Sequence, residues 1–163
     1  MWIAICVLVL LVLALLFLEM PALRRHPARA HMQGRYIAHR GLHDQTPETP
    51  ENSLAAFRAA VERGYAIEND IHLTADGQVV VFHDDTLDRM CGVPGRPEEK
   101  TLAQLKELSL AGTAEKIPTL QECLDAVDGQ VPLLIEFKCG TVAGARQLCA
   151  AADAILSAYK GEY

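Results

Sequence analysis

Four short apolar runs rich in β-favouring residues follow one another along the chain, and each ends close to a charged or imidazole side chain. They cover residues 37–41, 65–73, 78–82 and 131–137. Successive side chains of a strand point to opposite faces, so Glu68 and Asp70 share one face, as do Glu136 and Lys138. The pattern predicts four strands that carry His39, Glu68 with Asp70, His83, and Glu136 with Lys138 toward one edge of a sheet.

Segments with helical spacing separate these runs. Leu54, Phe57 and Val61 recur on one helical face, after Asn52 or Ser53 as the cap and before Gly64. Further helices are predicted within residues 102–108, 120–127 and 142–159, with loops over residues 42–51 and 84–99. Alternating strands and helices predict an α/β fold with a parallel sheet.

The length of the predicted domain, residues 35–163, limits this fold. An eight-stranded (β/α)8 barrel takes about 250 residues, whereas this segment has 129. We therefore expect the N-terminal half of a TIM barrel, in a chain that is a fragment or a truncated product.

Residues 1–20 are predicted to form one transmembrane helix, because residues 2–18 are apolar and carry no charge. A cleaved signal peptide is the alternative, but no basic residue precedes the run. The arginines follow the run, which places the soluble part in the cytoplasm of a single-pass membrane protein. Residues 21–34 are expected to form a basic, non-helical linker, because they contain Pro21 and Pro27.

Charge and cysteine content exclude some classes of function. The chain has a net charge of −6, and residues 35–163 carry 12 basic and 20 acidic side chains. Such an acidic domain is a poor nucleic-acid binder. Five cysteines without C-x-x-C spacing argue against a disulfide framework and against a thiolate zinc site.

Several short motifs occur in a fixed order. They are His39-Arg40-Gly41, Pro50-Glu51-Asn52-Ser53, Glu68-x-Asp70, Thr74-x-Asp76-Gly77, His83-Asp84, Ile117-Pro118-Thr119-Leu120 and Glu136-x-Lys138. Together they resemble the glycerophosphodiester phosphodiesterase family over residues 35–140, in particular its membrane-anchored bacterial members. The resemblance implies a TIM barrel, a divalent metal, and hydrolysis of glycerophosphodiesters to glycerol 3-phosphate and an alcohol in lipid metabolism.

The resemblance also implies roles for nine residues. The acid and base are His39 and His83, the metal ligands are Glu68, Asp70 and Glu136, the phosphate-binding residues are Arg40 and Lys138, and the supporting residues are Glu51 and Asn52. Which histidine is the acid stays open, and so does the nucleophile, which is water or the neighbouring glycerol hydroxyl. His43, His72, Asp84, Asp85 and Arg89 are expected to be structural or peripheral.

The residue types fit this chemistry. Carboxylates beside a phosphodiester anion repel it unless a cation lies between them, and oxygen ligands favour Ca²⁺ or Mg²⁺ over zinc. Imidazole is the side chain that exchanges protons near neutral pH. The substrate partner is thus expected to be a small glycerophosphodiester, with the N-terminal helix supplying membrane attachment.

The sequence departs from the family pattern in two ways. Asn69 stands where the family usually has an apolar residue, and we expect it to point outward under the helices. The later barrel strands are absent.

Two alternative functions stay open. They are lysophospholipase D- or phospholipase C-like activity, or a non-catalytic barrel remnant at the membrane.

Overall fold

The computed structural model describes residues 2–19, 29–44 and 46–163. The chain forms two compact units, Met1–Ala30 and His31–Tyr163. The first contains helix α1 (Trp2–Glu19), and helix α2 (Arg29–Met32) follows at the boundary between the units.

The N-terminal predictions are only partly met. No helix within the described ranges is long and apolar enough to cross a membrane, so the transmembrane helix expected over residues 1–20 is not confirmed. The prediction of a non-helical linker over residues 21–34 is wrong for its C-terminal part, where α2 forms. Proline restricts its own conformation and that of the residue before it, so Pro27 leaves residues 29–32 free to be helical. Residues 20–28 lie outside the described part of the chain.

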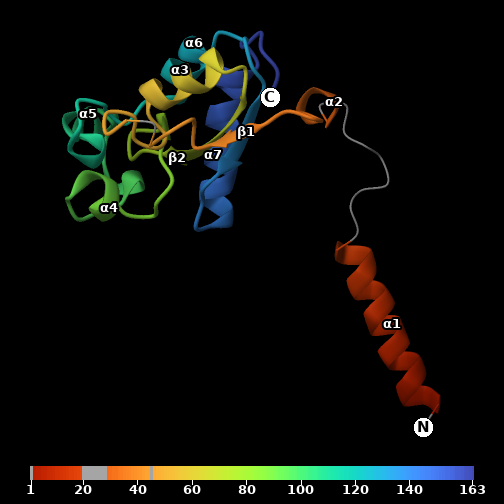
Figure 1. Cartoon of the computed structure of the whole chain (residues 1–163). Helices are drawn as coiled ribbons and strands as arrows, with labels where there is room; N and C mark the ends of the chain where they lie inside the picture. The colour runs from red at the N-terminus through yellow and green to blue at the C-terminus, as the bar shows by residue number, and fades with distance from the viewer. Residues whose placement is uncertain (1, 20–28, 45) are drawn as a thin grey trace. The chain divides into compact units, whose positions relative to one another are not determined.

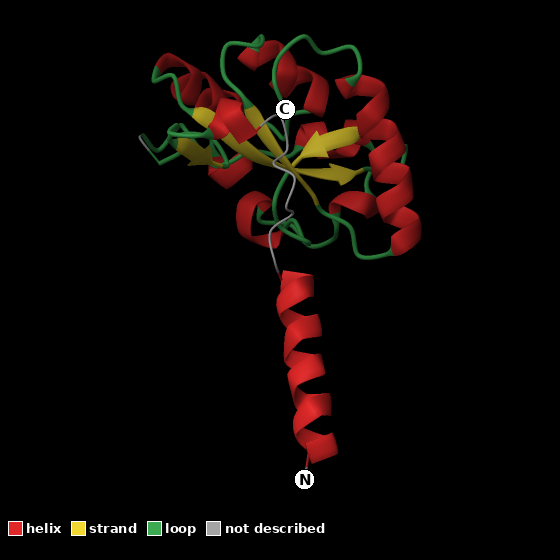
Figure 2. Cartoon of the chain, turned by 90° about the vertical axis from the view of Figure 1, so that its right-hand side faces the viewer, coloured by secondary structure: helices red, strands yellow, loops and turns green. Residues whose placement is uncertain are grey.

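The second unit is built around one central strand. β2 (Ala66–Leu73) pairs in parallel with β1 (Ile37–His39) on one side and with β4 (Leu133–Phe137) on the other. All eight of its residues are buried or nearly so. Figures 1 and 2 show this sheet among its helices. The predicted α/β fold with parallel strands is confirmed for these three strands.

β3 (Val79–Val81) does not continue the parallel sheet. It folds back antiparallel on the end of β2, with Ile71 opposite Val81 and Leu73 opposite Val79. A turn at Gly77, with a φ of 75°, joins the two strands. The prediction of four parallel strands is therefore wrong for β3. The Asp-Gly turn produces a hairpin, and a hairpin reverses the chain.

Three helices cover one face of the sheet. They are α3 (Leu54–Glu62), α6 (Leu120–Val127) and α7 (Val142–Leu156). Phe57, Leu124 and Leu148 from these helices pack with Ile67 and Ile71 of β2 in one apolar core. Because β2 alternates, its even-numbered residues Glu68, Asp70 and His72 face away from the helices. The acids therefore point to the opposite, inner face of the sheet.

Local capping fixes where these helices begin. The Ser53 hydroxyl accepts a hydrogen bond from the Ala56 N–H (3.1 Å), which starts α3. Thr119 and Glu122 form a reciprocal capping box at the start of α6. Gly64 takes a left-handed φ of 66° just after α3, as the sequence predicts. The Ser53 cap therefore defines the end of the loop that joins β1 to α3.

The segment after β3 is more ordered than the sequence suggests. Within the predicted loop 84–99 lie α4 (Asp88–Cys91) and the 3₁₀ turn η1 (Pro97–Glu99), and α5 (Leu102–Glu107) and the turn η2 (Leu110–Gly112) follow. A second apolar cluster anchors this segment, shown in green in Figure 1, through Phe82, Leu87 and Leu105. Helix α5 confirms the helix predicted within residues 102–108. The shorter α4 and the two 3₁₀ turns lack a readable period, so only their tertiary packing reveals them.

Asn69 lies on the helix-facing side of β2, as its position in the alternation predicts. Its Nδ2 donates to the Cys123 Sγ of α6 (3.2 Å), and the residue is fully buried. Its Oδ1 has no hydrogen-bond partner among the described residues. An unpaired buried acceptor is destabilising.

Replacing Asn69 with valine is therefore expected to raise the free energy of unfolding by about 1 kcal/mol, because it removes an unpaired amide oxygen from an apolar layer. Urea denaturation of the variant and the wild type measures the change. A lower stability of Asn69→Val would show that the contact with Cys123 outweighs the unpaired oxygen.

Candidate active site

Three carboxylates converge on the inner face of the sheet. Glu68, Asp70 and Glu136 each offer an oxygen, and the three oxygens lie within 4.8 Å of one another. Sheet register explains the cluster, because Asp70 lies directly opposite Glu136 and Glu68 precedes Asp70 by two residues. Glu68 and Asp70 are buried, whereas Glu136 is exposed. The structure thus brings together the three residues predicted as metal ligands.

Lys138 adds a cation to this cluster. Its Nζ lies 3.1 Å from Asp70 Oδ1 and 2.7 Å from Glu136 Oε1. Desolvation lowers the pKa of Lys138, but hydrogen bonds and charges from Glu136 and Asp70 outweigh it, so the pKa lies above its ordinary value. The predicted phosphate-binding lysine is therefore a charged group beside the acids.

His39 and Arg40 enter the site from the end of β1. His39 is level with Glu68 in the sheet, and its side chain is exposed. The Arg40 backbone N–H donates to Glu68 Oε2 (3.0 Å), and Arg40 Nε lies 3.8 Å from Asp70 Oδ2. The next residue must be glycine, since a Cβ on Gly41 would lie 2.9 Å from Ala56 Cβ. The loop therefore packs closely on α3 and holds Arg40 against the acids.

The two predicted supporting residues contact this loop and the buried acid. Asn52 Nδ2 donates to Asp70 Oδ2 (2.9 Å), and the Asn52 backbone N–H donates to the Arg40 carbonyl (2.9 Å). Glu51 Oε1 accepts from Arg40 Nη1 (3.0 Å). Asn52 adopts a φ of 54°, a left-handed conformation that asparagine tolerates better than most residues. Both residues therefore fix the position of Arg40.

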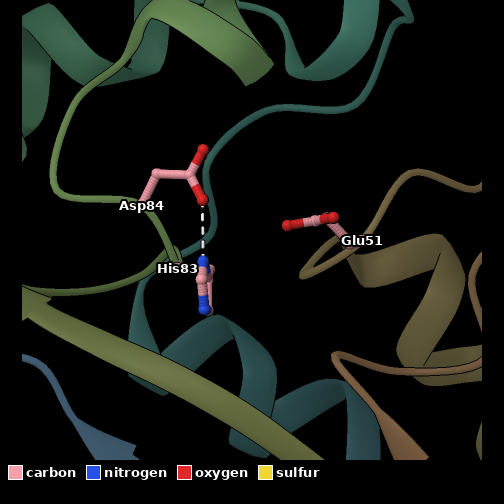
Figure 3. Close-up of side chains that lie close together, drawn as sticks. All are labelled: Glu51, His83 and Asp84. Atoms are coloured by element: carbon pink, nitrogen blue, oxygen red, sulfur yellow. Dashed lines mark hydrogen bonds and ion pairs between the residues drawn. The ribbon is translucent and has the colours of Figure 1, made fainter.

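His83 follows β3, which runs antiparallel to β2 and so brings the chain back toward the acidic cluster. The Phe82 N–H donates to the Asp70 backbone carbonyl (2.9 Å), so the chain leaves β3 next to the backbone of Asp70, one residue before His83. His83 Nδ1 lies 2.7 Å from Asp84 Oδ1, as Figure 3 shows. Because a carboxylate only accepts, Nδ1 carries the proton and Nε2 is the atom left for proton transfer.

Glu51, His83 and Asp84 form a second group with ligand atoms within 4.8 Å of one another (Figure 3). The guanidinium of Arg89 already neutralises both acids of this group, with its Nη2 2.6 Å from Glu51 Oε1 and its Nε 2.6 Å from Asp84 Oδ2. The His83 nitrogen in the group also donates to Asp84. The residues therefore fit an ion-pair network and do not fit a metal site.

The network shifts the acidity of its members. Hydrogen bonds from Arg89 outweigh desolvation and, with His83, lower the pKa of Asp84 from 3.8 to about 2. Burial raises the pKa of Glu51, but hydrogen bonds and charge from Arg89 and Arg40 outweigh it and hold that pKa below its usual 4.5. Both groups are carboxylates at neutral pH.

A pH dependence of stability follows from Asp84. Because folding lowers the pKa of Asp84 from 3.8 to about 2, its stabilising contribution is complete above pH 4 and is lost as the pH falls through 2. Urea denaturation at several pH values across this window is expected to show a steeper loss of stability for the wild type than for Asp84→Asn. Equal slopes would contradict the assignment.

His72 also lies in this region, although it was expected to be structural or peripheral. It is buried on the face of Glu68 and Asp70, its Nδ1 lies 3.2 Å from Glu98 Oε1, and its Nε2 lies 3.4 Å from the His83 carbonyl. Its position two residues after Asp70 in the alternation is the signal that could have found it. His43, by contrast, lies in the β1–α3 loop with Nδ1 2.7 Å from Asp44 Oδ2.

The first acidic cluster fits a hard divalent cation. All its donors are carboxylate oxygens, and oxygens around Ca²⁺ at about 2.4 Å lie no more than about 4.8 Å apart. Asp70 Oδ1 is buried, and the cation that faces it is the Lys138 ammonium, whose Nζ lies 3.1 Å away. A buried carboxylate oxygen of this kind is suited to an ion.

Sequence comparison decides the family. The profile of the glycerophosphoryl diester phosphodiesterase family matches residues 39–161. The chain belongs to this family. A glycerophosphodiester phosphodiesterase of Caldanaerobacter subterraneus subsp. tengcongensis is 41% identical over 115 residues, which cover 65% of this chain and 46% of that protein. A lysophospholipase D of Rattus norvegicus is 33% identical over 141 residues, which cover 78% and 44%.

Structural comparison agrees with membership of the glycerophosphoryl diester phosphodiesterase family. A phosphodiesterase of Oleispira antarctica, solved in complex with the product sn-glycerol-3-phosphate, matches with a TM-score of 0.72 and 32% identity, covering 81% of this chain and 55% of that one. A glycerophosphodiester phosphodiesterase of Thermotoga maritima matches with a TM-score of 0.65 and 32% identity, covering 81% and 54%. The chain thus spans about half the length of each of these four relatives and has a TIM-barrel-like fold.

Proposed function

We propose that the protein is a metal-dependent hydrolase of glycerophosphodiesters, which releases glycerol 3-phosphate and an alcohol. The observation that carries this proposal is the cluster of Glu68, Asp70 and Glu136 on the inner face of the sheet, level with the C-terminal ends of β1 and β4. Active sites of barrel enzymes lie at this end of the strands. The glycerol 3-phosphate bound to the Oleispira antarctica relative supports the substrate class.

The three acids are the proposed metal ligands. A divalent cation, Ca²⁺ or Mg²⁺, would supply positive charge that polarises a phosphoryl oxygen. Without such a cation, the carboxylates would repel the substrate by about 4 kcal/mol for a single pair at close range. Arg40 and Lys138 lie beside the acids and offer further positive charge to the phosphate.

The two histidines are the proposed proton donor and acceptor. The hydrogen bond from Nδ1 to Asp84 leaves His83 Nε2 to take or give a proton. His39 is exposed at the end of β1 beside Glu68, where a substrate in the site would reach it. One imidazole removes a proton from the nucleophile, which is water or the neighbouring glycerol hydroxyl, and the other protonates the leaving alkoxide. Attack by the glycerol hydroxyl gives a cyclic phosphate, which water then opens to glycerol 3-phosphate.

A second candidate function is the hydrolysis of lysophospholipids. The similarity to a lysophospholipase D of Rattus norvegicus covers 78% of the chain, more than the match to the bacterial phosphodiesterase. The two activities cleave the same type of phosphodiester and differ in the group attached to the glycerol. The acidic cluster serves either substrate.

A direct assay tests both functions. The protein is incubated with glycerophosphocholine or with lysophosphatidylcholine, each with calcium, with magnesium or with a chelator. Release of glycerol 3-phosphate from the first substrate only with a metal supports the proposal, and preference for the second supports the lysophospholipase. Turnover unchanged by the chelator contradicts the metal role, and no turnover of either substrate contradicts both functions. A position on the cytoplasmic side of a membrane stays a prediction.

A further inference from the structure

Arg89 is a half-exposed side chain on the short helix α4, and it uses its whole guanidinium in side-chain contacts. Toward Asp84 it donates from Nε (2.6 Å) and from Nη2 (2.7 Å). Toward Glu51 it donates from Nη2 (2.6 Å) and from Nη1 (3.0 Å). Nη1 also lies 3.1 Å from Met90 Sδ. Two carboxylates are thus each held by a two-pronged contact, which is the geometry that arginine favours and lysine lacks.

Each of these carboxylates holds a different group of the proposed site. Asp84 accepts the Nδ1 proton of His83 (2.7 Å). Glu51 accepts from Arg40 Nη1 (3.0 Å). The loop after β3 and the loop after β1 are therefore joined by one continuous chain of hydrogen bonds, with Arg89 at its centre.

Asp84 and Glu51 would not stay together without a cation. Their oxygens lie within 4.8 Å of each other, and two carboxylates at that distance repel. The guanidinium between them converts this repulsion into two attractive contacts. Figure 3 shows Glu51 across from the His83–Asp84 pair. The guanidinium of Arg89, which the figure does not draw, contacts both carboxylates.

We propose that Arg89 is a positioning residue that holds His83 and Arg40 at a fixed separation. It acts through Asp84 on the tautomer and orientation of the imidazole, and through Glu51 on the guanidinium that faces the acidic cluster. Arg89 contacts no reacting atom. Its kinetic consequences rest on the proposed hydrolysis, whereas its effect on His83 does not.

The decisive test is the tautomer of His83, read from the imidazole ¹⁵N and ¹H chemical shifts of the labelled protein at neutral pH. In the wild type, the proton is expected on Nδ1. In Arg89→Met, Asp84 loses its anchor, and a mixture of the two tautomers is expected. Arg58→Met, which removes an exposed arginine of α3, is the matched control and should leave the His83 signals unchanged.

A double variant shows whether Arg89 acts through Asp84. In an Asp84→Asn background, the added Arg89→Met substitution should leave the His83 signals where Asp84→Asn puts them. If Arg89→Met does not fold, Arg89→Lys is compared instead, because lysine keeps the charge and loses both two-pronged contacts. Unchanged His83 signals in the folded variant, or equal changes in Arg58→Met, would overturn the proposal.

The kinetic expectation is a fall in kcat/KM of about 10- to 100-fold for Arg89→Met, the usual effect of losing a group that orients another. The loss should divide between a lower kcat, from His83, and a higher KM, from Arg40. A change in KM alone, with the His83 tautomer intact, would contradict the coupling. Absence of turnover by the wild type would contradict the proposed function and leave the tautomer result standing.

Discussion

Alanine in place of His39 or His83 is expected to lower kcat by about 10²- to 10⁴-fold, the usual contribution of general acid–base catalysis. Calcium affinity is expected to be unchanged, because neither imidazole belongs to the cluster of three acids. Turnover of glycerophosphocholine measures the first quantity, and calorimetric titration with calcium measures the second.

A nearby histidine provides the control. His43 lies in the same loop as Arg40 and pairs with Asp44, so His43→Ala should keep kcat within a few-fold of the wild type. Loss of calcium binding in both His39→Ala and His83→Ala would show that the imidazoles help to hold the metal. Equal activity of all three variants would remove the histidines from the mechanism.

Asn in place of Asp70 is expected to abolish measurable calcium binding and to lower the free energy of unfolding by about 2–3 kcal/mol, since charged hydrogen bonds are lost in a buried place. Asp70 is fully buried, accepts from Asn52 Nδ2 and pairs with Lys138. Calorimetry with calcium and urea denaturation in the presence of a chelator separate the two effects.

Asp85→Asn is the matched control for this substitution, because Asp85 is an exposed carboxylate just after the His83–Asp84 pair. It should leave both calcium affinity and stability close to those of the wild type. Retained calcium affinity in Asp70→Asn would overturn the assignment of the acidic cluster. Unchanged stability would show that Lys138 and Asn52 find other partners.

Local signals made much of the fold predictable. The sequence predicted a strand over 65–73, and β2 covers Ala66–Leu73. Ser53, one of the two predicted caps, starts α3, because its hydroxyl accepts from an N–H in the first turn of that helix. The predicted parallel direction of β3 was wrong, because the composition of the apolar run 78–82 does not depend on the direction of the strand. Only the turn at Gly77 contains the information that the chain reverses.

The site was predictable to the extent that it depends on strand alternation. The spacing of Glu68 and Asp70 on one strand, with Glu136 on another, was enough to place three acids on one face. The contacts of Arg89 were not predictable, because they join residues 38 positions apart through a helix with no readable period. Arg89 was expected to be structural or peripheral, and its partners emerge only from the folded chain.

The central position of β2 limits how this protein can change over evolution. β1, β3 and β4 all hydrogen-bond to β2, which also carries Glu68 and Asp70. A mutation that displaces this strand would disturb folding and chemistry together, so selection acts on it twice. Variation in substrate preference is left to the connecting segments beyond the strand ends, where insertions and exchanges leave the acids in place.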